Sequence, residues 1–195
     1  MTSCGESAPC PLCGASAPYF AATALRAFFR CHHCDLIFVP TRFHLSLDRE
    51  KLRYNQHSNS AEDSGYQSYL ETIADQVTSI HRSGSHLLDF GSGLDFVLTR
   101  ILRRRGYNCT PYDPLYGIGL DALGGVYDGV ILCEVIEHLR DPGAALERLY
   151  SKVKPGGVLV VTTPNRWGAW AMFLDDDPTH IKVHSSAHWN ALARR

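Results

Sequence analysis

The stretch LLDFGSGLDF, from Leu87 to Phe96, sets a short apolar run against an acid and two glycines one residue apart. We expect His86–Gly91 to form a buried strand that ends at a glycine turn, and Asp95–Tyr107 to form the helix that follows. At such a turn the missing side chains let a ligand lie against the backbone, while the amides of the helix point at it. A phosphate-binding loop is excluded because no lysine follows the glycines. The dinucleotide fingerprint G-x-G-x-x-G fails because Phe96 holds its third glycine position.

Apolar runs and helical patterns alternate along the rest of the chain. The pattern predicts three more strands, a helix between the last two, and a leading helix before the first strand. This alternation predicts an α/β fold with a doubly wound, mostly parallel sheet, in which ligands bind outside the carboxyl ends of the strands. The predicted strands are Asn108–Pro114, Tyr127–Val135 and Gly157–Asn165, and the helices are Asp141–Gly157 and the stripe within Tyr69–His81.

Asp113 stands at the end of the second predicted strand, 20 residues beyond Gly93. A carboxylate at this place can accept hydrogen bonds from both ribose hydroxyls of an adenosine cofactor. The alternative is an acid that caps the turn before Pro114.

Four cysteines near the N-terminus stand in two C-x2-C pairs separated by 17 residues. Zn²⁺ prefers four soft ligands in a tetrahedron, and two such turns supply two thiolates each. The spacing predicts a zinc ribbon over residues 1–45, and the alternative is four unrelated free thiols. We expect the ribbon to brace a terminus that cannot bury a core of its own, and nucleic-acid binding is the second possibility. The predicted ligands are Cys10, Cys13, Cys31 and Cys34.

The composition narrows the class of protein and the partners. The chain has 195 residues, of which 45% are apolar, and a formal net charge of −1. No global positive charge indicates a nucleic-acid or membrane partner, and no apolar run approaches the roughly 18 residues of a membrane span. The first residues do not resemble a secretory signal. We therefore expect a cytoplasmic protein, in whose reducing surroundings seven cysteines indicate metal rather than disulfides.

Four motifs together resemble the class I S-adenosylmethionine-dependent methyltransferases: LLDFGSG, the strand-end acid in YDP, YDGVILCEVIEHL and LERLYSKVKPGGVLVVTTPN. A zinc ribbon ahead of such a domain also resembles a bacterial, largely uncharacterised group of these enzymes. The resemblance implies a Rossmann-like domain over residues 85–195, after a linker and leading helix at 46–84. It also implies a cofactor across Gly91 and Gly93 with its ribose on Asp113, while Asp89 orients the glycine loop or reaches the methionine end. Cys133 and Glu134 complete the implied cofactor site.

The sequence departs from the family pattern after Asp113. In the family, a helix, another strand and an acidic residue that hydrogen-bonds the adenine amine usually follow this acid. The segment between Pro114 and Tyr127 is too short for a full helix and strand, so we expect the sheet to be trimmed at this edge. Leu115, Tyr116 and Asp121 are candidates to cover the adenine.

The motif CEVIEHL, with a later histidine, is the candidate reaction centre. The pattern E-x-x-E-H plus a distant histidine is similar to one that binds a divalent cation in small-RNA 3′-end 2′-O-methyltransferases and in ubiquinone-pathway O-methyltransferases. The alternative is that these side chains pack against the cofactor loop without metal. Then His180 or His138 is the candidate general base, or the enzyme relies on proximity. The predicted catalytic residues are Glu137, His138 and His180, and the possible cation site adds Glu134.

The resemblance implies an enzyme that moves a methyl group from S-adenosylmethionine to a small-molecule oxygen, nitrogen or carbon. One alternative is an RNA-end 2′-O-methyltransferase, which the near-neutral charge disfavours. The other is a non-catalytic protein that binds S-adenosylmethionine, which the trimmed sheet edge favours. A last aromatic group forms either a lid over the acceptor or the buried face of a helix: Trp167, Trp170, Met172 and Phe173.

Overall fold

The computed structural model describes residues 5–56, 62–164, 170, 174, 177–185 and 189. The chain divides into two compact units. The first unit takes in the described residues of Met1–Arg53, Ile136–Ala145 and Thr163–Arg195, and the second is Tyr54–Val135 with Leu146–Thr162. The boundaries expected at 1–45, 46–84 and 85–195 stay a prediction about independent domains.

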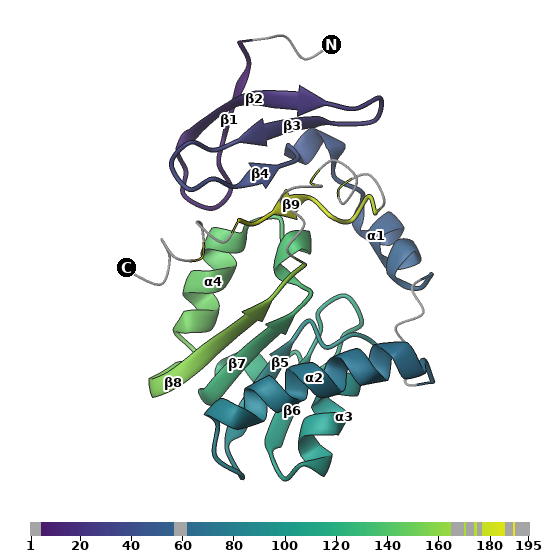
Figure 1. The fold of residues 1–195 in the computed structure, drawn as a ribbon, viewed down its shortest axis with the longest axis vertical. Helices are drawn as coiled ribbons and strands as arrows, with labels where there is room; N and C mark the ends of the chain where they lie inside the picture. The colour runs from purple at the N-terminus through teal and green to yellow at the C-terminus, as the bar shows by residue number, and fades with distance from the viewer. Residues whose placement is uncertain are drawn as a thin grey trace. The chain divides into compact units, whose positions relative to one another are not determined.

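The second unit is built on a parallel sheet of four strands in the order β6-β5-β7-β8 (Figure 1). β5 pairs in parallel with β6 on one side and with β7 on the other, and β8 pairs with β7. The parallel sheet and its alternation with helices confirm the expected α/β, Rossmann-like fold. The strands are β5 His86–Phe90, β6 Asn108–Tyr112, β7 Tyr127–Cys133 and β8 Val153–Thr162.

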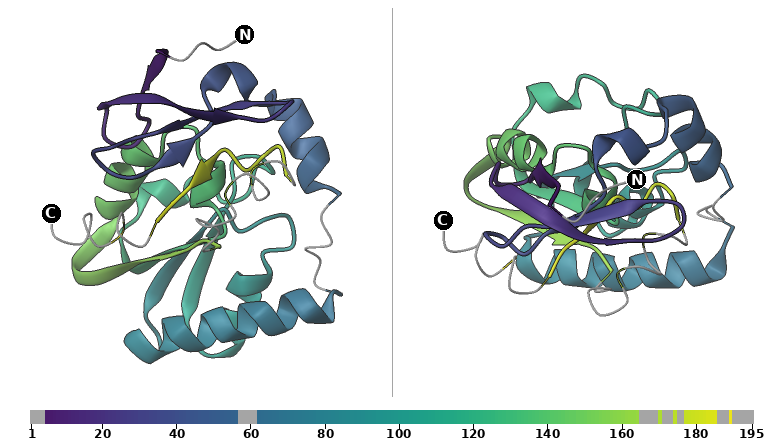
Figure 2. Two further views of the ribbon diagram at one scale, coloured as in Figure 1. Left: turned by 45° about the horizontal axis from the view of Figure 1, so that its top comes forward. Right: turned by 90° about the horizontal axis from the view of Figure 1, so that it is seen from above.

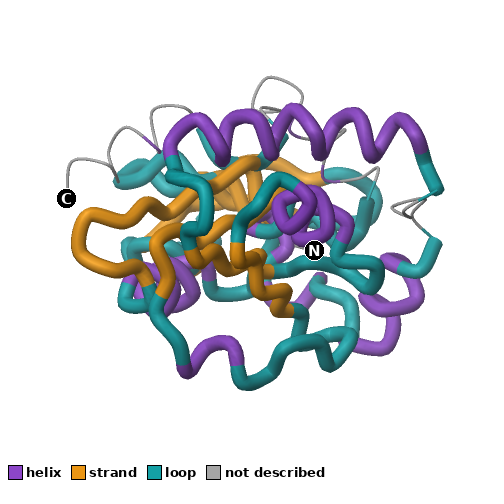
Figure 3. Tube along the Cα trace, turned by 90° about the horizontal axis from the view of Figure 1, so that it is seen from below, coloured by secondary structure: helices purple, strands orange, loops and turns teal. Residues whose placement is uncertain are grey.

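Two helices of this unit, α2 (Ser64–Ile80) and α3 (Val97–Arg104), share one buried cluster with the sheet. Their apolar side chains pack with Leu87 of β5 and Ile131 of β7, and Figure 3 shows the long helix α2 lying over one side of the strands. Leu88 alternates with Leu87 along β5 and is also fully buried. Since successive side chains of a strand point to opposite faces, both faces of β5 are covered. Burial on both faces explains why the strand appears as a continuous apolar run in the sequence.

Two details differ from the sequence expectation, and a third agrees with it. The leading helix begins at Ser64 rather than Tyr69, because the Asp63 carboxylate accepts a hydrogen bond from the amide of Tyr66 and caps it. Helix α4 (Pro142–Tyr150) ends earlier than expected, since β8 starts at Val153, which pairs with Tyr127. Between β6 and β7 the structure holds only a short 3-10 turn, η2 (Ala122–Gly124), as expected for a trimmed edge.

The first unit is built on an antiparallel sheet in the order β1-β2-β3-β4-β9. Its first four strands come from the N-terminus, and the fifth comes from near the C-terminus. Figure 2 shows this last strand, in yellow, beside the N-terminal strands. Turns and a short helix complete the unit: η1 Thr41–Phe43, α1 Leu47–Tyr54 and η3 Ile136–His138. The strands are β1 Ser7–Pro9, β2 Ser16–Ala22, β3 Ala27–Arg30, β4 Ile37–Phe38 and β9 Lys182–Val183.

Among the described residues, no helix has both the length and the apolar character needed to cross a membrane.

Candidate functional site

The two glycines after β5 serve different purposes. Gly91 has φ +78°, and a Cβ there would lie 2.5 Å from Cγ2 of Val135, so only glycine fits between the turn and the end of β7. Gly93 has φ +69°, and nothing lies within 4 Å of its would-be Cβ. The Gly91 turn is therefore fixed by packing, whereas the Gly93 turn borders open space. This is the arrangement required for a ligand to lie on the backbone.

Asp113, at the end of β6, is joined to the glycine turn. One of its carboxylate oxygens accepts a hydrogen bond from the amide of Gly93 at 3.0 Å, and the other accepts one from the amide of Leu115 at 3.0 Å. Its side chain is buried, and burial raises the pKa of Asp113 above its ordinary value. Each carboxylate oxygen has a second lone pair. The group can therefore accept further hydrogen bonds, as a ribose would offer, without giving up the turn.

Asp89 ties β5 to the beginning of α3. Its carboxylate accepts hydrogen bonds from both the amide and the hydroxyl of Thr99, at 3.1 and 2.7 Å. Only 2% of Asp89 is exposed, and this burial raises its pKa to about 6. The described hydrogen bonds of Asp89 therefore hold the beginning of α3, the helix that follows the glycine turn. Thr99 is a residue that the sequence analysis missed, since nothing in a lone threonine within an apolar helix indicates this role.

Glu134 and Cys133 stand at the carboxyl end of β7. Glu134 has φ +54°, which is unusual for a residue with a side chain and marks a strained backbone. Its amide donates to the carbonyl of Thr162, and its carboxylate accepts a 2.9 Å hydrogen bond from the hydroxyl of Tyr69 on α2. Burial raises the pKa of Glu134. Cys133 is half-buried and packs against the cluster of α2 and α3.

A second strained residue, Phe96, lies just before α3 with φ +37°. This is the position at which a dinucleotide-binding loop carries its third glycine. Strain in side-chain-bearing residues is typical of functional sites, because the surrounding structure must hold it in place. Phe96 and Glu134 thus both mark this edge of the sheet.

The residues expected to cover an adenine lie in the turn after Asp113. Ile118 exchanges backbone hydrogen bonds with Asp113 across this turn. The hydroxyl of Tyr116 donates to the side chain of Asn55 at 3.0 Å. Among the described residues of this turn, no contact of an acidic side chain identifies it as the partner of an adenine.

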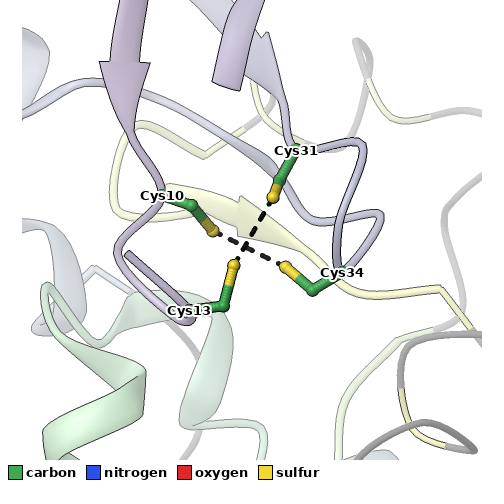
Figure 4. A group of neighbouring side chains, drawn as sticks. All are labelled: Cys10, Cys13, Cys31 and Cys34. Carbon is green, nitrogen blue, oxygen red and sulfur yellow. Dashed lines mark hydrogen bonds between the residues drawn. The ribbon is translucent and has the colours of Figure 1, made fainter. Parts of the chain in front are cut away.

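The four predicted zinc ligands come together in the first unit (Figure 4). The Sγ atoms of Cys10 and Cys34 are 3.6 Å apart, those of Cys13 and Cys31 are 3.5 Å apart, and all four lie within 4.8 Å of one another. These separations exclude disulfides, whose sulfurs are about 2.05 Å apart. They are close to the edge of about 3.8 Å of a tetrahedron whose Zn–S distance is about 2.3 Å.

The two cysteine turns repeat one backbone design. In each, the residue after the second cysteine, Gly14 or Asp35, has positive φ, at +73° and +60°. Its amide donates to the carbonyl of the first cysteine, Cys10 or Cys31, at 2.9 and 2.8 Å. Burial raises the pKa of the Cys13 thiol, an effect that a bound cation reverses. The donor set and its geometry therefore fit Zn²⁺.

Glu137, His138 and His180 form a second group of possible metal ligands, with one donor atom from each within 4.8 Å of the others. The His138 and His180 rings are 4.8 Å apart between centroids. His138 Nδ1 bonds to the carbonyl of Thr179 at 3.0 Å, which fixes the orientation of the ring. Glu137 is almost fully buried. The predicted fourth member, Glu134, belongs to the other unit, where Tyr69 holds its carboxylate.

Of the aromatic residues considered as a lid, Trp167, Met172 and Phe173 lie outside the described residues. Trp170 packs on the ring of Phe28, with 4.8 Å between centroids, and joins the buried cluster of Phe28, Ile37 and Val183. At this position the residue serves packing within the first unit.

A protein-family model described as a methyltransferase domain matches residues 62–195. The ubiquinone biosynthesis O-methyltransferase of Parvibaculum lavamentivorans is 32% identical over 88 residues, which cover 45% of this chain and 28% of that protein. That of Rickettsia canadensis is 30% identical over 121 residues, covering 50% of this chain and 51% of that protein. The chain thus spans about half or less of the length of these relatives.

Solved structures with a similar arrangement include a coclaurine N-methyltransferase bound to N-methylheliamine and SAH. Its TM-score is 0.46 at 14% identity, covering 79% of this chain and 57% of that one. An O-methyltransferase family protein from Burkholderia thailandensis has a TM-score of 0.44 at 18% identity, covering 75% of this chain and 60% of that one.

The burial of Asp89 predicts a pH-dependent stability. Its pKa of about 6 when folded lies above the value of about 3.9 expected when unfolded. The folded chain therefore binds more protons between these values, and its stability falls as the pH rises from 4 to 6. Asp89→Asn keeps an acceptor for Thr99 and does not titrate. We expect the free energy of unfolding of the parent, relative to this variant, to decline by about 2 kcal/mol between pH 4 and 6.

Urea unfolding of both proteins between pH 4 and 7 measures this difference. A difference that stays constant with pH would show that Asp89 titrates normally.

Proposed function

The chain belongs to the class I S-adenosylmethionine-dependent methyltransferases, and we propose that it transfers a methyl group from S-adenosylmethionine to the hydroxyl of a small molecule. The observation that carries the proposal is the hydrogen bond between the Gly93 amide and the Asp113 carboxylate. It joins an open glycine turn to a strand-end acid at the carboxyl edge of a parallel sheet, where ligands of such sheets bind. The names of the curated relatives support oxygen as the acceptor atom.

S-adenosylmethionine supplies an electrophilic methyl group when it is bound. In the proposal, the Asp113 carboxylate accepts hydrogen bonds from the ribose hydroxyls while it keeps its hydrogen bond with the Gly93 amide. The open side of the glycine turn receives the cofactor. Asp89 fixes the start of α3 through Thr99, so that the amides of this helix keep their direction. Cys133 and Glu134 face the methionine end, where Tyr69 orients the Glu134 carboxylate. All of these contacts lie within the second unit.

We also propose that Cys10, Cys13, Cys31 and Cys34 hold a structural Zn²⁺. The mutual distances of the sulfurs and the repeated turn geometry support this ion. Zn²⁺ bound by four thiolates has no open coordination position, so its role is to stabilise the fold. The small cluster packed around these cysteines would otherwise have to sustain the N-terminal strands by itself.

Glu137, His138 and His180 are proposed as the site of a second divalent cation next to the acceptor. One carboxylate and two imidazoles suit Mn²⁺, Mg²⁺ or Zn²⁺. Such a cation supplies Lewis acidity that helps an acceptor hydroxyl lose its proton at neutral pH. Without a cation, His138 or His180 is the proposed general base for the same proton.

The RNA-end alternative has less support. RNA binding requires exposed cations to neutralise phosphate. The N-terminal half contains several basic residues that could serve this purpose if exposed. Four of them are engaged within the chain: Arg26 with backbone carbonyls, Arg30 with Asp35, Arg42 with Glu6 and Arg53 with Asp177. We therefore favour a small-molecule acceptor. We further propose that the protein is cytoplasmic, because a reducing compartment keeps cysteines as thiols that can bind metal. The non-catalytic alternative predicts cofactor binding without turnover on any acceptor.

Asp113→Ala should weaken the binding of S-adenosylhomocysteine about 10- to 100-fold. The reason is the loss of up to two hydrogen bonds to a charged group, each of about 1.5–3 kcal/mol at most. Isothermal titration calorimetry measures the affinity. Asp128→Ala is the matched control, because Asp128 lies at the opposite end of the sheet and pairs with Lys154. Equal affinity of the Asp113 variant and the parent would rule out the ribose assignment.

Cys31→Ser should abolish stoichiometric zinc, because four-thiolate sites rarely survive the loss of one ligand. Elemental analysis of the purified protein measures the metal content. Cys109→Ser is the control, since Cys109 is buried against α3 in the other unit. A Cys31 variant with the parent's zinc content would contradict the four-cysteine site.

Glu137→Gln should weaken Mn²⁺ binding by about tenfold or more, since even outer-shell partners of a metal are worth about 10- to 100-fold. Electron paramagnetic resonance of free Mn²⁺ during titration measures the affinity, with zinc already bound to the cysteines. Glu147→Gln, an exposed change on α4, is the control. Parental affinity in the Glu137 variant would exclude this cation site.

A further inference from the structure

The segment that carries His180 is attached to the N-terminal ribbon by backbone pairing. β9 follows His180 by two residues and pairs with β4, so that the ribbon sheet gains a strand from the other end of the chain (Figures 1 and 2). Hydrogen-bonded pairing fixes the position of a strand along its neighbour. The contacts are the pairs Ile37 with Val183 and Phe38 with Lys182, and the amide of Val39 donating to the carbonyl of Ile181 at 3.0 Å.

Arg26, just before β3, holds the same segment through its side chain. Its Nη1 donates to the carbonyl of Pro178 at 3.3 Å and to that of His180 at 3.2 Å. The residue is 7% exposed. A guanidinium keeps its charge when buried, so burying it without acceptors costs free energy. Arg26 therefore requires these two carbonyls as hydrogen-bond acceptors. The backbone of His180 is therefore set by a side chain of the ribbon.

The segment in turn holds the other two members of the group. The His138 ring bonds to the carbonyl of Thr179 at 3.0 Å, and the amide of Ile181 donates to the carbonyl of Glu137 at 3.1 Å. Thr179 is itself fixed, because its amide and hydroxyl donate to the Asp177 carboxylate at 2.8 and 2.6 Å. Arg53 pairs with the same carboxylate at 3.3 Å.

The first cysteine turn also contacts the segment that carries Glu137 and His138. A Cβ on Gly143 would lie 2.8 Å from the carbonyl oxygen of Leu12, so the beginning of α4 lies directly against the peptide between Cys10 and Cys13. Only glycine permits this approach. The peptides that hold zinc and the segment 136–145 are therefore in backbone contact.

We propose that the N-terminal ribbon positions the side chains of the reaction centre. Arg26 is the positioning residue for His180 and, through Thr179, for His138. This inference rests on the proposed role of Glu137, His138 and His180. It gives the ribbon a function beyond bracing the terminus, since the ribbon sets the geometry of the three side chains. It also couples the cysteine turns to that geometry through Gly143.

The test uses the full zinc-loaded chain with Arg26→Met, Arg26→Lys and the control Arg42→Met. Arg42 is a more exposed arginine of the ribbon that pairs with Glu6. The first readout is the histidine ring signals of ¹⁵N-labelled protein across pH, assigned with His180→Gln. The second is Mn²⁺ affinity by electron paramagnetic resonance.

We expect Arg26→Met to shift the ring signals of His180 and His138 and to weaken Mn²⁺ binding about 10- to 100-fold. Arg26→Lys, which keeps the charge but has no planar fork, should lie between this variant and the parent. Arg42→Met should match the parent in both readouts. Calorimetry with S-adenosylhomocysteine should give parental affinity in all three variants.

Parental His180 and His138 signals in zinc-loaded Arg26→Met would overturn the proposal. If Arg26→Met loses zinc or fails to fold, Arg26→Lys decides by the same readouts, and parental signals in it overturn the proposal. If the parent binds no Mn²⁺, the cation assignment fails by itself, and the ring signals still decide the role of Arg26.

Discussion

The parallel pairing of β5 between β6 and β7 is the constraint on which the cofactor edge depends. Parallel strands end on the same side, so their last residues must meet there. The pairing lets the amide of Gly91 donate to the carbonyl of Tyr112 at 2.8 Å, and two residues later Gly93 reaches Asp113. A shift of one residue in this register would turn Asp89 away from Thr99 and bring apolar side chains to the wrong face. The site is thus a direct consequence of sheet geometry.

A second pairing, of β4 with β9, has the same importance for the other unit. It brings residues near the end of the chain to a sheet built by the beginning. Through it the ribbon gains the segment that carries His180, and Arg26 becomes buried against carbonyls instead of facing solvent. The positive charge of Arg26 would favour nucleic-acid binding if it faced solvent, but here the side chain donates hydrogen bonds to backbone carbonyls.

Strain and burial are concentrated where the chemistry is proposed. Phe96 and Glu134 carry side chains in a backbone region that favours glycine, and both border the cofactor edge. Asp89 and Asp113 are carboxylates whose pKa burial raises, and both are compensated by hydrogen bonds from backbone amides. Such groups destabilise the fold unless their partners are in place. Their presence near the carboxyl ends of the strands is consistent with a site retained for binding.

The sequence alone determined the α/β fold, the parallel sheet and the gathering of four cysteines, because periodic apolar runs and C-x2-C turns act over short distances along the chain. It also indicated Asp113, since the end of a strand is a local feature. It could not determine that β9 joins the ribbon or that Arg26 holds His180, because those contacts link residues more than 140 positions apart. It missed Thr99 for a similar reason: a threonine gains its role only when a buried carboxylate is folded against it. Tertiary structure decided these contacts, since only packing brings distant backbones and side chains to hydrogen-bonding distance.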